Sequence, residues 1–232
     1  MKRTFITKLI SFLSVSGFKS RHLIRKAVAD IHSEDFEAAC LKLDKVISTN
    51  SYNYLAYYNR GIAREGMRDY RGAIEDYTRC ISYRPSFAEA YYRRGNALFQ
   101  LQEYSGALVE LNKSLELNPR LTQAYSYRGI TKHELNDLLG ALEDYSMAIK
   151  LDPFDAVSLH NRGNLKLLFD DPRGALNDFN QAINIDPRYA VAYVGRGNAK
   201  LRLGSQSGAE LDWKKAEHLQ HEAEERVFNE KK

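Results

Sequence analysis

The sequence predicts an all-α fold of tandem helical hairpins, because three separate marks recur along it at an interval of 34 residues. The first mark is an Arg-Gly pair, the second is a Gly-Ala pair that starts eleven residues after the first glycine, and the third is a proline. The marks fall at Arg60-Gly61, Arg94-Gly95, Arg128-Gly129, Arg162-Gly163 and Arg196-Gly197, at Gly72-Ala73, Gly106-Ala107, Gly140-Ala141, Gly174-Ala175 and Gly208-Ala209, and at Pro85, Pro119, Pro153 and Pro187. Units of this length cannot bury a core alone and must stack on their neighbours. We therefore expect an extended binding surface rather than an enclosed active site.

Residues 88–121 show how one unit is built. A first helix over residues 88–100 is expected from three residues on its apolar side: Tyr91, Leu98 and Leu101. A second helix is expected from apolar residues at helical spacing: Ala107, Leu108, Leu111, Leu115 and Leu117. Pro119 ends this helix, because proline disfavours helical geometry in the residue before it. Glycine inside a helix costs about 1 kcal/mol relative to alanine, so we expect Gly95 to allow close helix approach, with the small Ala107 opposite.

The pattern resembles the tetratricopeptide repeat, whose units carry an aromatic residue, a glycine, an alanine, a second large residue and a proline in this order. The aromatic position holds Tyr57, Tyr91, Tyr125, Leu159 (which departs from the pattern) and Tyr193. The second large position holds Tyr77, Leu111, Tyr145, Phe179 and Trp213. The resemblance implies a right-handed α-solenoid that acts as a non-catalytic scaffold for protein–protein interaction.

Counting back one period adds a weaker first copy, in which Ala27 replaces the glycine and Ser51 the proline. Six units are thus expected, at residues 20–53 (degenerate), 54–87, 88–121, 122–155, 156–189 and 190–223, followed by a helical extension and tail at 224–232. In the sixth unit His221 replaces the proline, so its second helix is expected to continue as a polar capping helix. His218, His221 and Glu222 lie on this charged helix as a solvated face, and we expect no metal site there.

Charge is distributed unevenly. Met1–Lys26 holds seven basic residues and no acid, and taking these from the 34 basic residues leaves 27 against 30 acidic ones. The array therefore lacks the basic excess that neutralises phosphates, and we expect no nucleic-acid partner. No apolar run approaches the roughly 20 residues of a membrane span. Cys40 and Cys80 fall at helix positions and are expected to be buried reduced thiols.

Arginine stands where the family more often has leucine. Sixteen residues after each arginine comes an acid: Arg60 and Asp76, Arg94 and Glu110, Arg128 and Asp144, Arg162 and Asp178, Arg196 and Asp212. Because sixteen residues separate facing points on the two helices, we expect a ladder of ion pairs within or between units. The first unit has Lys26 and Lys42 at these two positions. The alternative is that the arginines reach into the groove and hold an acidic partner.

The resemblance places partner binding in a concave groove lined by the first helices. The residues that it places on this stripe are Tyr58, Asn59, Ile62, Tyr92, Arg93, Asn96, Phe99, Tyr127, Ile130, His160, Asn161, Asn164 and Asn198. Tyrosines offer a large contact area with a polar tip, and asparagine amides both donate and accept, which suits a peptide backbone. We expect a peptide segment or a partner helix as ligand and no cofactor. The alternative is that several of these side chains pack on neighbours or face water.

Chaperone-binding members of the family grip a C-terminal carboxylate with five polar residues from three units. In the best register the five positions here hold Ile24, Val28, Asn59, Glu89 and Arg93. Two of them match, and Glu89 has the wrong charge for a carboxylate ligand. The sequence therefore argues against this carboxylate clamp. It also contains no nucleophile–base set, phosphate-binding loop or metal-ligand spacing, so we expect no enzyme activity and no catalytic residues.

Residues 1–19 precede the array as a basic amphipathic segment. Its apolar stripe consists of Phe5, Ile6, Leu9, Ile10, Phe12 and Leu13. Such a segment can be a cap helix on the first unit, a helix on an anionic membrane surface, a signal peptide, or a transit peptide or disordered tail. The second function hypothesis is accordingly a membrane-associated assembly or transport factor anchored by residues 1–19. A cytoplasmic or membrane-peripheral location is expected, or an exported or organellar one if the segment is a targeting peptide.

Overall fold

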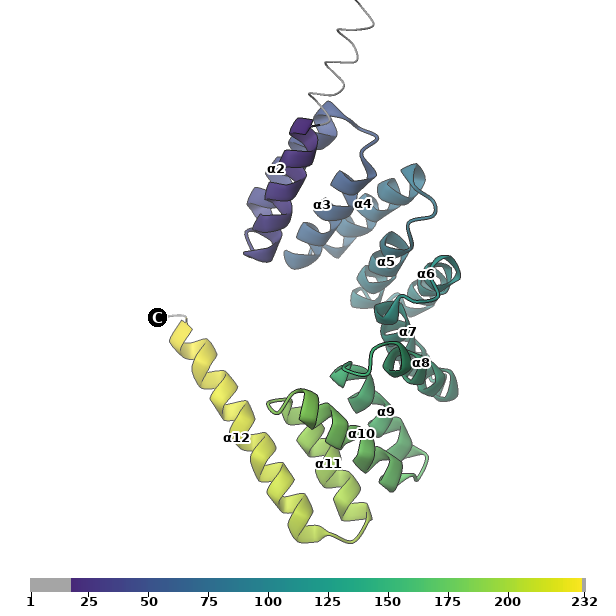
Figure 1. Cartoon of the computed structure of the whole chain (residues 1–232), viewed down its shortest axis with the longest axis vertical. Coiled ribbons are helices and arrows are strands. Elements are labelled where there is room, and N and C mark those ends of the chain that lie inside the picture. The colour runs from purple at the N-terminus through teal and green to yellow at the C-terminus, as the bar shows by residue number, and fades with distance from the viewer. Residues whose placement is uncertain (1–17, 231–232) are drawn as a thin grey trace, which may run out of the picture. The chain divides into compact units, whose positions relative to one another are not determined.

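The computed structural model describes residues 18–230, and every regular element in that range is a helix, as Figure 1 shows. The all-α prediction is therefore confirmed for the described part of the chain. The amphipathic segment predicted at residues 1–19 lies outside the described residues except for its last two.

Consecutive helices pair as antiparallel hairpins. Helical residues 18–32 and α2 (Phe36–Thr49) form the first hairpin. The others are α3 (Tyr54–Gly66) with α4 (Tyr70–Tyr83), α5 (Ala88–Gln100) with α6 (Tyr104–Leu117), α7 (Thr122–Glu134) with α8 (Leu138–Leu151), α9 (Ala156–Leu168) with α10 (Pro172–Ile185), and α11 (Ala190–Arg202) with α12 (Gln206–Glu230). The chain divides after Leu121 into two compact units, which we call the N-terminal and the C-terminal unit.

The turn inside each hairpin has a fixed backbone shape. One residue of every turn has a positive φ, and these residues again lie 34 apart: Glu34, Arg68, Gln102, Asn136, Asp170 and Gly204. The residue after the positive φ begins the second helix as its N-cap, and Asp35, Asp69, Asp137 and Asp171 each accept a backbone N–H there. This mark was not predicted, because residues of such different chemistry share the position.

The helix glycines make room for large side chains of the facing helix. A Cβ at Gly61 would lie 2.5 Å from Tyr77 Cε1, and one at Gly95 would lie 3.0 Å from Leu111 Cγ and 3.2 Å from the Ala107 carbonyl oxygen. Tyr77 and Leu111 are completely buried. The expected contact between two small residues, Gly95 and Ala107, is therefore only part of the interface. The main gain is burial of the large residue against the glycine.

Two further predictions concern α12 and the cysteines. The 25-residue α12 runs from Gln206 to Glu230 and continues past His221, as expected from the missing proline. Both cysteines are free thiols; Cys80 is fully buried, whereas Cys40 is only partly buried. Burial raises the pKa of the Cys80 thiol to about 12. Within residues 18–230, no helix is both long enough and apolar enough to cross a membrane.

Candidate functional site

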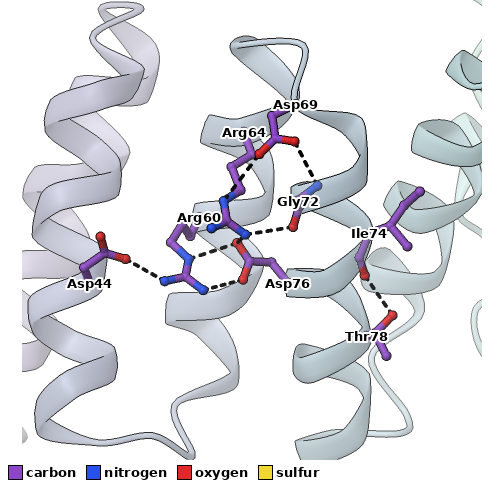
Figure 2. A network of polar contacts seen from close by, with 8 residues as sticks. All are labelled: Asp44, Arg60, Arg64, Asp69, Gly72, Ile74, Asp76 and Thr78. Atoms are coloured by element: carbon purple, nitrogen blue, oxygen red, sulfur yellow. Dashed lines mark hydrogen bonds and ion pairs between the residues drawn. The ribbon is translucent and has the colours of Figure 1, made fainter.

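The arginines form the expected ladder of ion pairs inside the hairpins. Arg60 donates from Nε to Asp76 Oδ2 at 2.9 Å and from Nη2 to Asp76 Oδ1 at 2.6 Å, as Figure 2 shows. The same two-point pairing joins Arg128 to Asp144, Arg162 to Asp178, and Arg196 to Asp212. Arg94 instead donates from Nη2 to both oxygens of Glu110. The prediction of a ladder is confirmed.

A second cation shares four of these acids, and sequence reasoning missed it. It lies four residues after the arginine, one helical turn along the first helix. The pairs are Arg64 with Asp76 (3.0 Å), Lys132 with Asp144 (2.8 Å), Lys166 with Asp178 (2.7 Å) and Lys200 with Asp212 (2.8 Å). Their interval of 34 residues was the available signal. In the third hairpin this position holds Leu98, and the acid there is Glu110 rather than an aspartate.

The arginines also reach the preceding hairpin. Arg60 Nη1 lies 2.6 Å from Asp44 Oδ1 on α2, which Figure 2 shows on the neighbouring helix. Arg94 donates to Thr78 Oγ1 (3.0 Å), Arg162 to Ser146 Oγ (3.3 Å) and Arg196 to Asn180 Oδ1 (3.0 Å). These guanidinium groups therefore hold two hairpins together. The structure favours this stacking role over the alternative in which the arginines bind an acidic partner.

The first hairpin carries the pair with its charges exchanged. Lys42 stands where the other hairpins have their acid, and Asp30 stands where four of them have the second cation. Lys42 forms an ion pair with Asp30. The two helices are thus still joined across the same positions.

In the N-terminal unit, several of the predicted groove residues are buried or bound by neighbouring side chains. Tyr92 is buried, with 9% of its surface exposed. Tyr58 packs edge-on against Phe87, with ring centroids 4.9 Å apart. Arg93 Nη1 donates to Glu65 Oε2 at 3.0 Å, and burial raises the pKa of the Glu65 carboxyl although Arg93 offsets part of the effect. The alternative of packing on neighbours therefore describes this cluster well.

The remaining groove residues of this unit are less enclosed. The Asn59 side chain donates to the Leu55 carbonyl of its own helix at 2.7 Å. Phe99 packs on Tyr104, with ring centroids 5.2 Å apart. Ile62 and Asn96 are partly exposed, and Asn96 Oδ1 is buried without a hydrogen-bond partner in the described structure.

In the C-terminal unit, the predicted groove residues lie on an open face. Tyr127 and Ile130 of α7 line a cavity of about 440 Å³ beside α9. Asn164 on α9 and Asn198 on α11 are exposed, and Asn161 is partly exposed. His160 packs on Tyr189 with ring centroids 5.4 Å apart, and burial lowers the pKa of its imidazole.

Exposed aliphatic residues accompany these asparagines, and sequence reasoning missed them. Val157 on α9 is 45% exposed, and on α11 Val191, Val194 and Leu201 are 43%, 36% and 46% exposed. Val157 lies three residues from the predicted His160, and Val191, Val194 and Leu201 lie seven, four and three residues from the predicted Asn198. Helical spacing was therefore the available signal. We call Val157, Val191, Val194 and Leu201, with Asn164 and Asn198, the aliphatic–amide stripe.

At the end of the array, His218 and His221 on α12 lie near glutamates one turn further along. His218 Nε2 is 3.0 Å from Glu222 Oε1, and His221 Nδ1 is 3.4 Å from Glu225 Oε1. Both histidines are exposed, and Glu222 also binds Arg188. Among the residues that the structure describes, no group of three or more potential ligands is placed to hold a metal ion.

Comparison with known proteins agrees with this architecture. Residues 58–122 match the family model described as tetratricopeptide repeat. A structure of PilF from Pseudomonas aeruginosa aligns with a TM-score of 0.82 and 13% identity, over 94% of this chain and 99% of that one. No curated protein gives a significant sequence match.

Two further solved structures align over a smaller part of the chain. MamA from Desulfovibrio magneticus RS-1 aligns with a TM-score of 0.64 and 22% identity, over 74% of this chain and 97% of that one. YrrB, described as a TPR protein with an unusual peptide-binding site, aligns with a TM-score of 0.59 and 24% identity, over 73% and 88%. At these identities the likenesses establish the fold.

Proposed function

Since this chain is a tetratricopeptide repeat protein, we propose that it is a non-catalytic scaffold that binds a peptide segment or a partner helix on its first helices. The aliphatic–amide stripe of the C-terminal unit is the observation that carries this proposal. Aliphatic side chains there are 36–46% exposed on adjacent helices, next to the exposed amides of Asn164 and Asn198, although Asn164 Nδ2 also lies 2.9 Å from His160 Nε2. A peptide can bury the former and hydrogen-bond to the latter.

The cavity beside α9 supports the same proposal. Its volume of about 440 Å³ falls in the range of ligand pockets, and Tyr127 and Ile130 from the predicted groove line it. The structurally similar YrrB is described as having a peptide-binding site, which supports a peptide as the class of ligand.

Selection of peptides from a displayed random library by the full chain tests the proposal. We expect a variant with Val157→Asp and Val194→Asp to bind the selected peptides with an affinity lower by about tenfold or more, because charges replace two apolar side chains that the bound peptide would cover. Both valines are exposed in the free protein, so helicity should be unchanged.

Val109→Asp is the matched control, because Val109 is 65% exposed on α6, a second helix of the N-terminal unit. It should leave binding unchanged. Selected peptides that bind the double variant as tightly as the original chain would contradict the proposed surface.

The alternative, a membrane-associated assembly or transport factor, depends on residues 1–19. The basic and apolar composition of that segment is what favours it. The full chain would then bind anionic vesicles and lose this binding on Leu9→Asp with Phe12→Asp. Equal binding by the variant would reject the alternative.

A further inference from the structure

The cavity in the C-terminal unit has an apolar wall and an acidic rim. It lies between α7, α9 and the loop before α9. Ile130, Phe154 and Val157 contribute apolar surface, and Phe154 is 76% exposed. Asp152 and Asp155 contribute carboxylates, and no basic residue lines the cavity. The combination suits a side chain with an aliphatic stem and a charged end.

The groups that bind these two carboxylates are neutral. Asp152 Oδ1 accepts the Phe154 backbone N–H at 3.0 Å. Asp155 Oδ1 accepts the Ser158 backbone N–H at 3.0 Å, and its Oδ2 accepts the Ser158 hydroxyl at 2.6 Å. The N-terminus of α9 adds about +0.5 elementary charge nearby. This is smaller in magnitude than the combined negative charge of the two carboxylates. The rim therefore has a net negative potential.

The cations of the surrounding first helices are held elsewhere. The ladder binds the arginine and lysine pairs of α7, α9 and α11 to the buried acids: Arg128 and Lys132, Arg162 and Lys166, Arg196 and Lys200. Arg202 at the end of α11 donates to the Leu167 carbonyl at 2.7 Å. These cations therefore do not neutralise Asp152 and Asp155.

The fold does not require acids at these two positions. One hundred and two residues earlier, at three repeat intervals, Asn50 and Asn53 occupy them. Asn50 Oδ1 accepts the Tyr52 N–H at 3.1 Å, and Asn53 Oδ1 accepts the Ala56 N–H at 3.2 Å, so the amides make the same backbone contacts. In the hairpins α3–α4 and α5–α6, the position that corresponds to Asp152 holds Arg84 and Asn118. The next hairpin has Asp186 and Tyr189 at the two positions, so among the described hairpins two acids occur together only at this cavity.

We infer that the partner is a basic, partly apolar segment of another protein, and that the cavity takes one of its lysine or arginine side chains. The methylene stem lies on Ile130, Phe154 and Val157, and the charged end binds Asp152 and Asp155. Apolar residues further along the segment contact the aliphatic–amide stripe. This inference rests on the proposed function, since it specifies the ligand of the same face.

The test compares the peptides selected by the full chain with those selected by a variant carrying Asp152→Asn and Asp155→Asn. Asparagine keeps the backbone hydrogen bonds, as Asn50 and Asn53 show, and removes the charge; at Asp155 its Nδ2 can donate to Ser158 Oγ in place of the hydrogen bond that the hydroxyl now donates to Oδ2. The full chain should enrich lysine and arginine, and the variant should not. A selected peptide should weaken about tenfold when its central lysine is replaced by norleucine, and this difference should shrink as salt is added.

Asp137→Asn is the matched control, because Asp137 caps α8 in the same way without lining the cavity. It should retain the enrichment. If the selected peptides are not enriched in lysine and arginine but still require Val157 and Val194, this inference is overturned and the proposed scaffold function stands. If no peptide is selected, both the inference and the proposed function are overturned. Light scattering tests whether the occupant is a second copy of this chain. If the full chain is a dimer and the variant with Asp152→Asn and Asp155→Asn is a monomer, the cavity binds a second copy and the inference is overturned.

Discussion

In the N-terminal unit Tyr92 is buried and Arg93 is bound by Glu65, whereas in the C-terminal unit Val157 and Asn164 are exposed on the corresponding face. Both units carry the same arginine–acid ladder and the same glycine contacts. In this array the framework residues therefore recur in both units at the 34-residue interval, whereas the exposure of the residues on the partner-facing side differs between the two units.

The ladder gives the largest expected effect. Asp178 is fully buried between Arg162 and Lys166, whereas Glu110 is 17% exposed and pairs with Arg94 alone. Asp178→Ala leaves two cations beside an empty site and should lower the free energy of unfolding by about 3–5 kcal/mol. Glu110→Ala should cost only about 1–2 kcal/mol. Urea unfolding followed by circular dichroism measures both.

A suitable control for these variants is Glu116→Ala, since Glu116 is 67% exposed beside Lys113. Its effect should stay within about 0.5 kcal/mol. Equal losses for Asp178→Ala and Glu110→Ala would mean that the second cation adds nothing to the C-terminal unit.

The contributions of Asp212 in the C-terminal unit and Glu65 in the N-terminal unit to the pH dependence of stability should have opposite signs. At Asp212 burial opposes ionisation, but hydrogen bonds from Arg196 and Lys200 outweigh it and lower the pKa below the usual 3.8. Its contribution is therefore present above that pH and is lost as the pH falls further. At Glu65 burial raises the pKa above the usual 4.5. Its contribution is therefore lost as the pH rises through 4.5 and beyond.

Unfolding free energies of Asp212→Asn and Glu65→Gln between pH 2.5 and about 7 check both signs. Asp212→Asn should flatten the decline on the acid side, and Glu65→Gln should flatten the decline on the neutral side. If Asp212→Asn leaves the acid decline unchanged, the carboxylate is not ionised preferentially in the folded array.

The hairpin turns give the smallest effect. The positive-φ residue is Glu34, Arg68 or Gln102 in the N-terminal unit but Asn136, Asp170 or Gly204 in the C-terminal unit. Asparagine, aspartate and glycine tolerate this conformation better than the other residues. Gln102→Gly should therefore stabilise the protein by about 0.5–1 kcal/mol.

At the C-terminal end Gly204→Ala should destabilise by a similar amount, although a Cβ there meets no atom within 4 Å. Thermal unfolding measures both, and Asn136→Gly, with a smaller change than Gln102→Gly, is the internal comparison. A gain at Asn136 as large as that at Gln102 would contradict the explanation.

The helices, the glycine positions and the arginine–acid pairs could be predicted from sequence, because each repeats at one interval. The second cations could have been predicted in the same way, since Lys132, Lys166 and Lys200 repeat at the same interval. They were missed because residues 88–121, from which the pattern was defined, have Leu98 at this position. The open face was not predictable in the same way. Whether Tyr92 is buried or Val194 exposed depends on the side chains of the adjacent hairpin, which the periodic marks do not specify.

The first hairpin, in which the charges are exchanged, differs from the interior hairpins in a way that affects how such an array can gain repeats by gene duplication. Within each unit, an interior arginine takes a hydrogen-bond acceptor from the hairpin before it, as Arg60 does from Asp44. Exposed Lys26 stands at that position in the first hairpin and makes no such contact within the described residues. Gene duplication of an interior hairpin would therefore supply each new arginine with an acceptor. Moving that hairpin to the front would leave an arginine without one, which gives the array a preferred direction of lengthening.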